Sequence, residues 1–317
     1  MGLYPREIIL ETTNHCNLRC RFCHFHGEGV KKRRPKGFLS RRLFFRILEE
    51  LSSWRPPHSI TLCLHGAGEP LLHPELKDFL EAAVAVPHLR VGFMTNAMLL
   101  SEDWARFLVE LPLAWIAFSV DGVRPETNDT FRRGARLQKI EKNISRLLAY
   151  KREKKSPLPE VSFNMVKYPG VSEEEVQAYV ARWLPEAARV MVSRFRPIGS
   201  RRLLTPQERL CLSPRPCPLP FQQLVVGWDG QVGLCCEDPF LEIFLGDANN
   251  QRLLEIFSGP RLSRVRELIS SLRLEALPLC RDCDVWAAEI PLKEEIIEIG
   301  GKKVRVIYRP SGRLFLP

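Results

Sequence analysis

The chain has 317 residues, 45% of them hydrophobic and 26% charged, and a formal net charge of +10. This length is enough for a large hydrophobic core and for one or two domains. Because the sequence contains no run of about 18 apolar residues and no signal-peptide pattern, we expect neither a membrane span nor export. Ten cysteines could indicate a secreted protein with disulfides, but their clustered spacing predicts metal sites in a reducing cytoplasm.

Short apolar, β-branched segments recur through the first two thirds of the chain, and amphipathic stretches separate them. Six such segments predict strands, at 7–11, 59–64, 89–94, 114–119, 160–166 and 189–194. The residues 40–53 repeat apolar positions on one helical face, and Ser172 with Glu175 forms a capping box that opens another helix. Alternating strands and helices predict an α/β fold with a parallel sheet and right-handed crossovers. Six units are too few for a closed eight-stranded barrel, and catalytic groups are expected at the carboxyl ends of the strands.

The last third of the chain breaks this alternation. The proline-rich passage 196–220 is typical of a linker. Apolar runs on both sides of Asp229-Gly230 predict a hairpin, and the tail 296–315 has two β-rich runs around Gly300-Gly301 that predict another. Helices are expected at 252–257 and 261–272.

Three cysteines, Cys16, Cys20 and Cys23, stand in one short loop with the spacing Cys-x-x-x-Cys-x-x-Cys, directly after the first predicted strand. Three thiolates can hold three irons of a four-iron cluster and leave the fourth iron open to bind a small molecule. The alternatives are buried thiols or a zinc site, which His24 or His26 could complete, although zinc sites usually show paired Cys-x-x-Cys hooks.

The loop resembles the signature of the radical S-adenosylmethionine (SAM) superfamily, in which an aromatic residue, here Phe22, precedes the last cysteine. The resemblance implies a partial (β/α)6 TIM-like barrel whose [4Fe-4S] cluster is held by Cys16, Cys20 and Cys23. It also implies that the open iron chelates SAM. One electron from the cluster would cleave SAM to methionine and a 5′-deoxyadenosyl radical, which abstracts a hydrogen atom from the substrate.

The second predicted strand ends in His-Gly-Ala-Gly-Glu-Pro, which resembles the Gly-Gly-Glu-Pro motif of this superfamily. The resemblance implies that this stretch meets the amino group of SAM. Gly66 and Gly68 let the backbone approach closely, and Glu69 can balance an ammonium charge. The alternative is a tight strand-to-helix turn.

Three further positions resemble contacts to the rest of SAM. Asn96 and Ser119, at the ends of the third and fourth predicted strands, resemble the ribose-facing positions, although short polar residues also suit turns and caps. Arg133 is the candidate for a bidentate contact with the SAM carboxylate, with a solvated arginine as the alternative.

A second group of cysteines follows the linker. Twelve residues, Gly230 and four residues separate Cys217 from Cys235, and two residues separate Cys280 from Cys283. This pattern resembles the twitch domain, the shorter relative of the SPASM domain, and implies one auxiliary [4Fe-4S] cluster held by these four cysteines. Because side chains alternate across a strand, Cys235 rather than the adjacent Cys236 is expected to face the metal. A zinc ribbon is the alternative.

The resemblance spans about residues 7–290. It divides the chain into a radical SAM core at 1–200, a small α+β twitch or SPASM-like iron–sulfur domain at 201–290, and a β-hairpin extension at 291–317 that lies outside the resemblance.

The full set of auxiliary thiolates favours electron transfer. We therefore predict a radical SAM oxidoreductase that carries out a net two-electron oxidation, or dehydrogenation, of a small polar metabolite such as an aminoglycoside-type alcohol. The alternative is an epimerase or a cross-linking maturase of ribosomal peptides or metabolites, with Cys236 as a hydrogen donor. Since the core begins by residue 7, no fused peptide-recognition domain is expected. An alternative of another class is a zinc-bearing nucleic-acid-binding protein.

The basic run 31–36 follows the cluster loop and has three interpretations: a solvated face, a docking site for an acidic flavodoxin or ferredoxin, or a phosphate contact. Because no aromatic residues are interleaved in it, a nucleic-acid partner is not expected. The strand-tip residues Asn164, Arg194 and Arg196 are candidates to face the substrate. Cys63 is expected to be a small buried hydrophobe, and Cys211 has no evident role.

Overall fold

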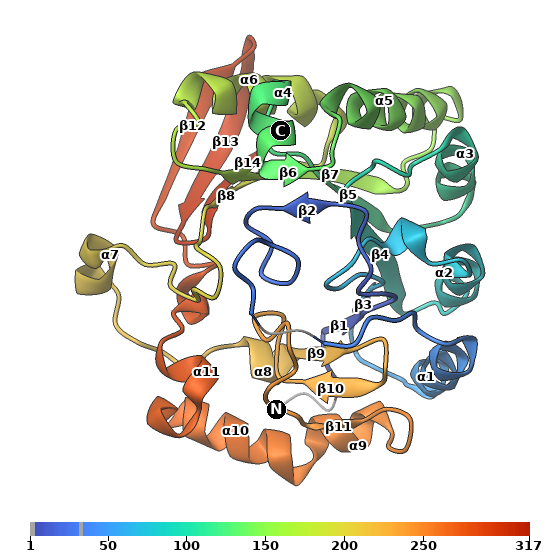
Figure 1. Cartoon of the computed structure of the whole chain (residues 1–317), viewed down its shortest axis with the longest axis vertical. Helices are drawn as coiled ribbons and strands as arrows, with labels where there is room; N and C mark the ends of the chain where they lie inside the picture. Colours follow the sequence, from blue (N-terminus) through green and yellow to red (C-terminus); the bar gives the residue numbers. More distant parts are fainter. Residues whose placement is uncertain (1–3, 32–33) are drawn as a thin grey trace. The chain divides into compact units, whose positions relative to one another are not determined.

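The computed structural model describes residues 4–31 and 34–317 (Figure 1). The chain forms two compact units, each built from discontinuous segments. The first unit comprises Met1–Cys16, Lys31–Phe93 and Ser213–Trp286, and the second comprises Asn17–Val30, Met94–Leu212 and Ala287–Pro317. The domain boundaries at 200 and 290 stay a prediction.

The first unit contains a mixed sheet in which strands from its N-terminal segments lie beside strands from its last segment. Its strands, in spatial order, are β11 (Gly246–Asp247), β10 (Gln231–Gly233), β9 (Gln223–Val226), β1 (Glu7–Leu10), β3 (Ile60–Cys63) and β4 (Leu89–Thr95), whose last two residues belong to the second unit. The strands β9, β1, β3 and β4 run parallel, while β10 and β11 are antiparallel. The strand that precedes Cys235 therefore extends the sheet that begins at the N-terminus.

The helices of the first unit pack beside this sheet. They are α1 (Arg41–Ser53), η1 (Pro70–Leu72), α2 (Leu76–Val84), α8 (Leu219–Gln222), α9 (Leu253–Ser258), α10 (Pro260–Ser270), η3 (Leu274–Ala276), α11 (Pro278–Arg281) and, across the boundary, η4 (Val285–Ala287). Ser40 caps α1, because its side chain accepts a hydrogen bond from the backbone of Leu43. The buried rings of Phe44 and Phe79 stack at 4.0 Å and join α1 to α2.

The second unit has parallel strands followed by an antiparallel edge. Its strands, in spatial order, are β5 (Trp115–Ser119), β7 (Glu160–Lys167), β8 (Arg189–Arg194), β14 (Gly312–Leu316), β13 (Lys302–Arg309) and β12 (Lys293–Ile299). A separate two-stranded ribbon pairs β2 (Arg19–Cys20) with β6 (Arg132–Arg133). The C-terminal residues thus continue the sheet at β8 (Figure 1).

The helices of the second unit are α3 (Glu102–Glu110), α4 (Pro125–Phe131), α5 (Leu137–Glu153), α6 (Glu173–Trp183), η2 (Leu184–Glu186) and α7 (Pro206–Cys211). The core between β7 and α6 is aromatic: the rings of Phe163 and Trp183 stack at 4.4 Å and are fully buried. This ring stack packs α6 against β7.

The predicted α/β class is confirmed, and each of the six predicted strands lies within one or two residues of its expected bounds. Three local predictions were wrong. The passage 196–220 contains α7 and α8 rather than a plain linker. Ser172 caps α6, but the Glu175 side chain turns to Thr127 and Arg124 instead of closing a capping box. The tail has three strands, because β14 follows the predicted hairpin and pairs with β8. Among the described residues, no helix has the length and apolar character that a membrane crossing requires.

Candidate active site and auxiliary cysteines

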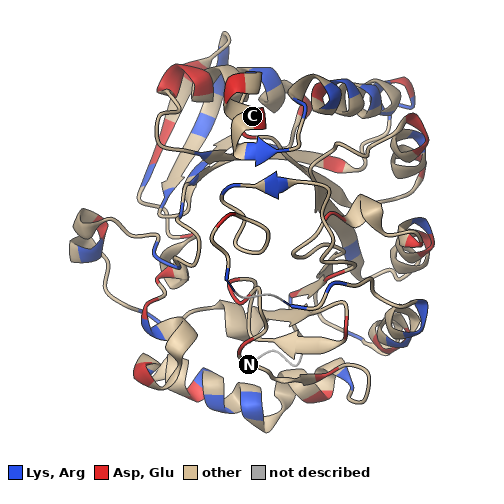
Figure 2. Ribbon diagram, viewed as in Figure 1, with Lys and Arg blue, Asp and Glu red and all other residues tan. Residues whose placement is uncertain are grey.

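Within the second unit, the cluster loop is tied to the ribbon of β2 and β6. Arg19 lies opposite Arg133 and Cys20 lies opposite Arg132, and Figure 2 shows the basic character of both strands. Cys20 is buried, while Cys23 is half-buried and its Sγ accepts a hydrogen bond of 3.2 Å from the backbone of His26. The ribbon therefore fixes the backbone at Cys20.

Burial raises the pKa of the Cys20 thiol to about 11, although the nearby Arg132 guanidinium acts in the opposite direction. A thiol with such a pKa loses its proton at neutral pH only when a cation takes the proton's place, as a coordinated metal does. The donor chemistry of Cys20 thus fits an iron–sulfur ligand.

The side chains of Arg132 and Asp121 form a buried ion pair next to Cys20. The Arg132 Nε lies 2.7 Å from Asp121 Oδ2, and the two side chains are 8% and 0% exposed. Although burial alone would lower the pKa of Arg132, the charges of Asp121 and Cys20 leave it raised. Asp121 also accepts hydrogen bonds from the backbone of Val166 at 2.8 Å and from the Tyr168 hydroxyl at 3.4 Å. This carboxylate therefore joins β6 to the end of β7.

Aromatic rings pack against the cluster loop next to the Arg132–Asp121 ion pair. The Arg132 guanidinium lies 5.4 Å from the centre of the Phe22 ring, and Phe22 meets Tyr168 edge-on at 5.2 Å. Tyr168 in turn stacks on Phe131 at 3.6 Å. The residues that carry this cradle, Asp121, Arg132 and Tyr168, were missed from the sequence, although the pair Arg132-Arg133 and the strand end at Asp121 were visible signals.

The proposed contacts for the ribose and the carboxylate of SAM have local partners. Asn96 is buried, donates to Asn17 Oδ1 at 2.8 Å and accepts from the backbone of Met98 at 3.0 Å. Ser119 ends β5 in register with Asn164 of β7. The Arg133 side chain is 49% exposed and pairs with Glu28. The assignment of these residues to SAM stays a prediction.

In the first unit, the glycines of the Gly-Ala-Gly-Glu stretch permit a close backbone approach. A Cβ on Gly68 would lie 2.4 Å from the carbonyl oxygens of Thr13 and His15, and one on Gly66 would lie 2.6 Å from Glu11 Cγ. The Glu69 amide donates to the His15 carbonyl at 2.8 Å. The stretch is thus fastened to the residues that immediately precede Cys16.

Glu69 is 2% exposed, and its Oε1 accepts a hydrogen bond of 3.1 Å from the backbone of Leu71, which caps η1. A buried carboxylate needs a cation or several donors. The ammonium of SAM would supply such a cation, but that contact also stays a prediction.

Replacement of Glu69 by alanine is expected to weaken SAM binding by orders of magnitude. The ammonium of SAM would then be buried without its carboxylate partner, which costs about 3–5 kcal/mol. Glu69→Gln keeps an acceptor for the Leu71 amide and removes only the charge, so it separates the capping role from the charge role. Calorimetry with both clusters intact should show weak SAM binding for both variants. Near-parental affinity of Glu69→Gln would contradict the assignment.

The four auxiliary cysteines, Cys217, Cys235, Cys280 and Cys283, lie in the first unit and are half-buried. Burial raises the pKa of Cys283 to about 12, with smaller contributions from the charges of Cys217 and Cys280. Burial also raises the pKa of Cys235 well above its usual range, and the charges of Cys236, Cys217 and Cys280 contribute in that order. Because the charges of Cys217 and Cys280 oppose the ionisation of Cys235 and Cys283, a cationic cluster would offset the repulsion of these thiolates. Across residues 4–31 and 34–317, no three His, Cys, Asp or Glu side chains converge on a point where a single metal ion could bind.

Cys236 has a different neighbourhood from Cys235. It is exposed, its backbone amide donates to Gln223 Oε1 at 2.9 Å, and its charge contributes to the raised pKa of Cys63, for which burial is the main cause. Cys63 is buried, as expected, and its Sγ lies 3.4 Å from Glu7 Oε1. The assignment of Cys235 rather than Cys236 as the ligand stays a prediction.

Two arginines that the sequence placed on a solvated face or at the substrate are engaged in ion pairs instead. Arg34 belongs to the basic run but is only 10% exposed, since it pairs with Glu11 at 3.0 Å and Asp229 at 3.6 Å; it is a structural residue, while Lys32 and Arg33 lie outside the described residues. The Arg194 guanidinium donates two hydrogen bonds of 2.7 Å to the Glu208 carboxylate. Its guanidinium is thus already occupied by a carboxylate.

The sequence profile of the radical SAM superfamily matches residues 10–182, more than half of the chain. The chain belongs to the radical SAM superfamily. A second profile, the iron–sulfur cluster-binding SPASM domain, matches residues 217–284. The protein is therefore a radical SAM enzyme with a SAM-binding [4Fe-4S] cluster and an auxiliary cluster, and the alternative of a zinc-bearing nucleic-acid-binding protein was wrong.

Curated relatives carry several activities. The chain is 28% identical to the tungsten-containing aldehyde ferredoxin oxidoreductase cofactor-modifying protein of Pyrococcus furiosus, over 59% of this chain and 48% of the relative. It is 25% identical to the GTP 3′,8-cyclase of Alkaliphilus oremlandii, over 79% of both chains. The chain spans about half the length of several other relatives that it matches.

Solved structures of this radical SAM fold are also similar. BtrN in complex with AdoMet and 2-DOIA has a TM-score of 0.60 at 18% identity, over 90% of this chain and 94% of BtrN. Streptococcus suis SuiB bound to S-adenosylmethionine has a TM-score of 0.65 at 16% identity, over 84% of this chain and 68% of SuiB. At these identities the likeness shows the fold alone.

Proposed function

We propose that this radical SAM enzyme catalyses a net two-electron oxidation of a small polar metabolite. The observation that carries the proposal is the set of four half-buried auxiliary cysteines in the first unit, in which the charges of Cys217 and Cys280 act on both Cys235 and Cys283. A cluster with four protein thiolates has no open iron for a substrate, so its simplest role is electron transfer. If the auxiliary cluster accepts an electron from the substrate radical, the reaction is a net oxidation of the substrate.

When bound, the [4Fe-4S] cluster with an open iron supplies the electron that cleaves SAM into methionine and a 5′-deoxyadenosyl radical. The residues of the chain prepare this step. Cys16, Cys20 and Cys23 would hold the cluster, and the Arg132 cation favours the thiolate form of Cys20. Gly68 allows the backbone approach that places Glu69, whose carboxylate would balance the SAM ammonium.

The electron balance of the proposed oxidation is complete. A 5′-deoxyadenosyl radical would take a hydrogen atom from a substrate carbon, and the substrate would then give up one proton to solvent and one electron. Cys217, Cys235, Cys280 and Cys283 would hold the auxiliary cluster that accepts this electron and passes it to a carrier. The net charge of +10 favours an acidic carrier such as a flavodoxin or ferredoxin.

The similar structures support two substrate classes. BtrN was solved with AdoMet and 2-DOIA, and the likeness extends over nearly all of BtrN, which supports a small-molecule substrate here. SuiB was also solved with the precursor peptide SuiA, which supports peptide modification as the second candidate. The four auxiliary cysteines favour the oxidative candidate.

Replacement of Cys235 by alanine tests the proposal, with Cys236→Ala as the matched control. We expect Cys235→Ala to lose about four of about eight irons per chain and still to form 5′-deoxyadenosine, because the SAM-cleaving loop is untouched. Incubation of the parental enzyme with SAM, dithionite and a metabolite extract should yield one 5′-deoxyadenosine per product molecule. By mass spectrometry this product should lack two hydrogen atoms, and Cys235→Ala should not form it.

Cys236→Ala is expected to keep all of its iron and the product. Iron loss in Cys236→Ala with full iron in Cys235→Ala would reverse the ligand assignment. A product of unchanged mass that carries deuterium from solvent would instead identify an epimerase, and formation of that product should then depend on Cys236.

A further inference from the structure

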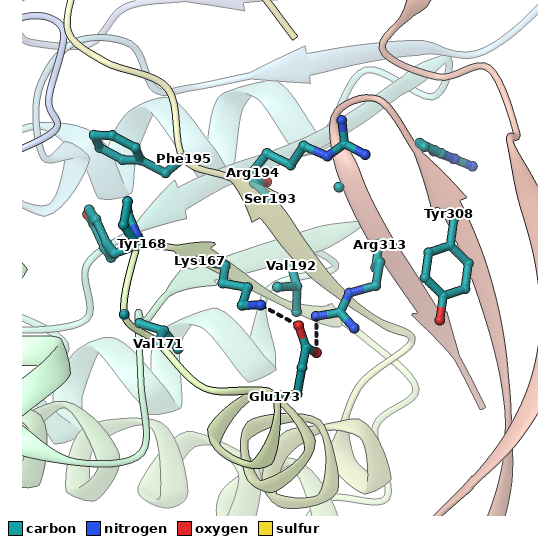
Figure 3. A pocket seen from close by; sticks show the side chains of 14 residues that line it. Lys167, Tyr168, Val171, Glu173, Val192, Ser193, Arg194, Phe195, Tyr308 and Arg313 are labelled. Carbon is teal, nitrogen blue, oxygen red and sulfur yellow. Dashed lines mark hydrogen bonds and ion pairs between the residues drawn. The ribbon is translucent and has the colours of Figure 1, made fainter. Parts of the chain in front are cut away.

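A groove of about 610 Å³ lies in the second unit, between the parallel strands and the C-terminal hairpin (Figure 3). One wall is the end of β7 with the loop that follows it, a second is the end of β8, and the third is the turn between β13 and β14. This volume is in the range of small-molecule sites. The groove contains none of the ten cysteines.

The lining of the groove is strongly basic. Four cationic side chains line it, Lys167, Arg194, Arg309 and Arg313, of which Arg194 is already paired with Glu208, and Glu173 is the acidic residue among the lining residues. Glu173 serves two cations at once: it pairs with Lys167 and lies 2.8 Å from the Arg313 guanidinium, as Figure 3 shows. One carboxylate between two cations leaves both of them with donors to spare.

Arg309 is the second cation of the groove whose hydrogen-bond donors have too few acceptors. Its Nε is buried and has no hydrogen-bond partner among the residues that the structure describes. Its other end pairs with Glu289, whose side chain is 70% exposed. Buried guanidinium donors are normally satisfied, and an ion pair with so exposed a carboxylate contributes little. The Arg309 guanidinium is therefore only partly neutralised by the residues that the structure describes.

The remaining walls are apolar or aromatic. Val192, Phe195 and Tyr308 line the groove, and Tyr168 lies at the same end as Phe195 in Figure 3. Oxyanion recognition beside a ring or an aliphatic surface selects an organic anion rather than a bare inorganic one.

We propose that this groove is a binding site for a small organic oxyanion, a carboxylate or a phosphate ester, whose charged group meets Arg309 and Arg313. Arg194, Arg309 and Arg313 lie outside both matched segments, 10–182 and 217–284. The site is also separate from the oxidation proposed above, and it shares only Tyr168 with the packing of the cluster loop.

Calorimetry on the anaerobic holoenzyme tests the site with three probes: inorganic phosphate, acetate and benzoate. We expect saturable binding, with benzoate tighter than acetate because of the apolar walls. The stronger of phosphate and benzoate identifies the ligand as a phosphate ester or a carboxylate. Ionic strength is held constant, since salt screens exposed charges. Absence of saturable binding for all three probes would overturn the proposal.

Variants of the groove sharpen the test. Arg313→Gln should weaken binding about tenfold or more, because a charge-assisted hydrogen bond is lost. Glu173→Gln should tighten binding, because it removes the carboxylate that competes for Lys167 and Arg313. A gain in affinity cannot arise from misfolding.

Two matched controls lie close by. Arg305 is on the same strand, β13, but pairs with Glu294 away from the groove, and Glu174 is beside Glu173 in the first turn of α6. Arg305→Gln and Glu174→Gln should leave the affinities unchanged. If Arg305→Gln weakens binding as much as Arg313→Gln, the anions are attracted by net charge alone, and the proposal is wrong.

Discussion

Replacement of Cys20 by alanine is expected to abolish 5′-deoxyadenosine formation. Cys20 lies on β2, which pairs with β6, and its buried side chain has a pKa of about 11 that a metal ion would lower. The loss of one of three thiolates leaves the SAM-cleaving cluster with two ligands. Iron should therefore fall from about eight to about four atoms per chain, with the auxiliary cluster retained.

The measurement is chromatography of the products of SAM with dithionite, beside an iron assay on the same anaerobic sample. Cys211→Ala is the control, because Cys211 is exposed on α7 and belongs to neither group of cysteines. It should retain both iron and activity. Unchanged SAM cleavage by Cys20→Ala would show that Cys20 is not a cluster ligand.

Replacement of Arg132 by leucine is expected to destabilise the protein by about 3–5 kcal/mol, because it leaves the fully buried Asp121 without its cation. The same change removes the positive charge that lowers the pKa of Cys20, so that pKa should rise further and the thiolate should be harder to form. We therefore expect Arg132→Leu also to load less iron into the SAM-cleaving cluster.

Urea unfolding followed by tryptophan fluorescence measures the first effect, and the iron content after reconstitution measures the second. Arg106→Leu is the matched control, since Arg106 pairs with Glu102 on the exposed face of α3 and should change neither quantity. Arg132→Lys keeps the charge but loses the planar fork, so it should recover iron loading more than stability. Normal stability and iron in Arg132→Leu would mean that the ion pair has no role in positioning the loop.

The strands and helices of the core could be predicted because their signals are local. The apolar runs that became β1, β3, β4, β5, β7 and β8 were recognised from a few neighbouring residues each. Ser172 marked a helix start for the same reason, since a capping side chain reaches only three residues along the chain.

The partners of charged residues could not be predicted in this way. The sequence placed Arg132 beside Arg133 without a means to distinguish them, and the structure buries Arg132 on Asp121 while Arg133 stays half-exposed. Glu175 completed a capping-box pattern, yet it pairs with Arg124, 51 positions away. Arg34 looked like part of a solvated run and instead meets Asp229 of a later hairpin.

The sequence by itself determined the family, the two groups of cysteines and the alternation of the six core strands with helices, because metal-ligand spacing and apolar periodicity are properties of short segments. Only the tertiary structure decided which charges are buried together. It also showed that β13 and β14, outside both family matches, complete a basic groove with the ends of β7 and β8. The reason is physical: a buried ion pair or a groove depends on chain segments that meet only after folding, and desolvation on burial sets the pKa values of such groups.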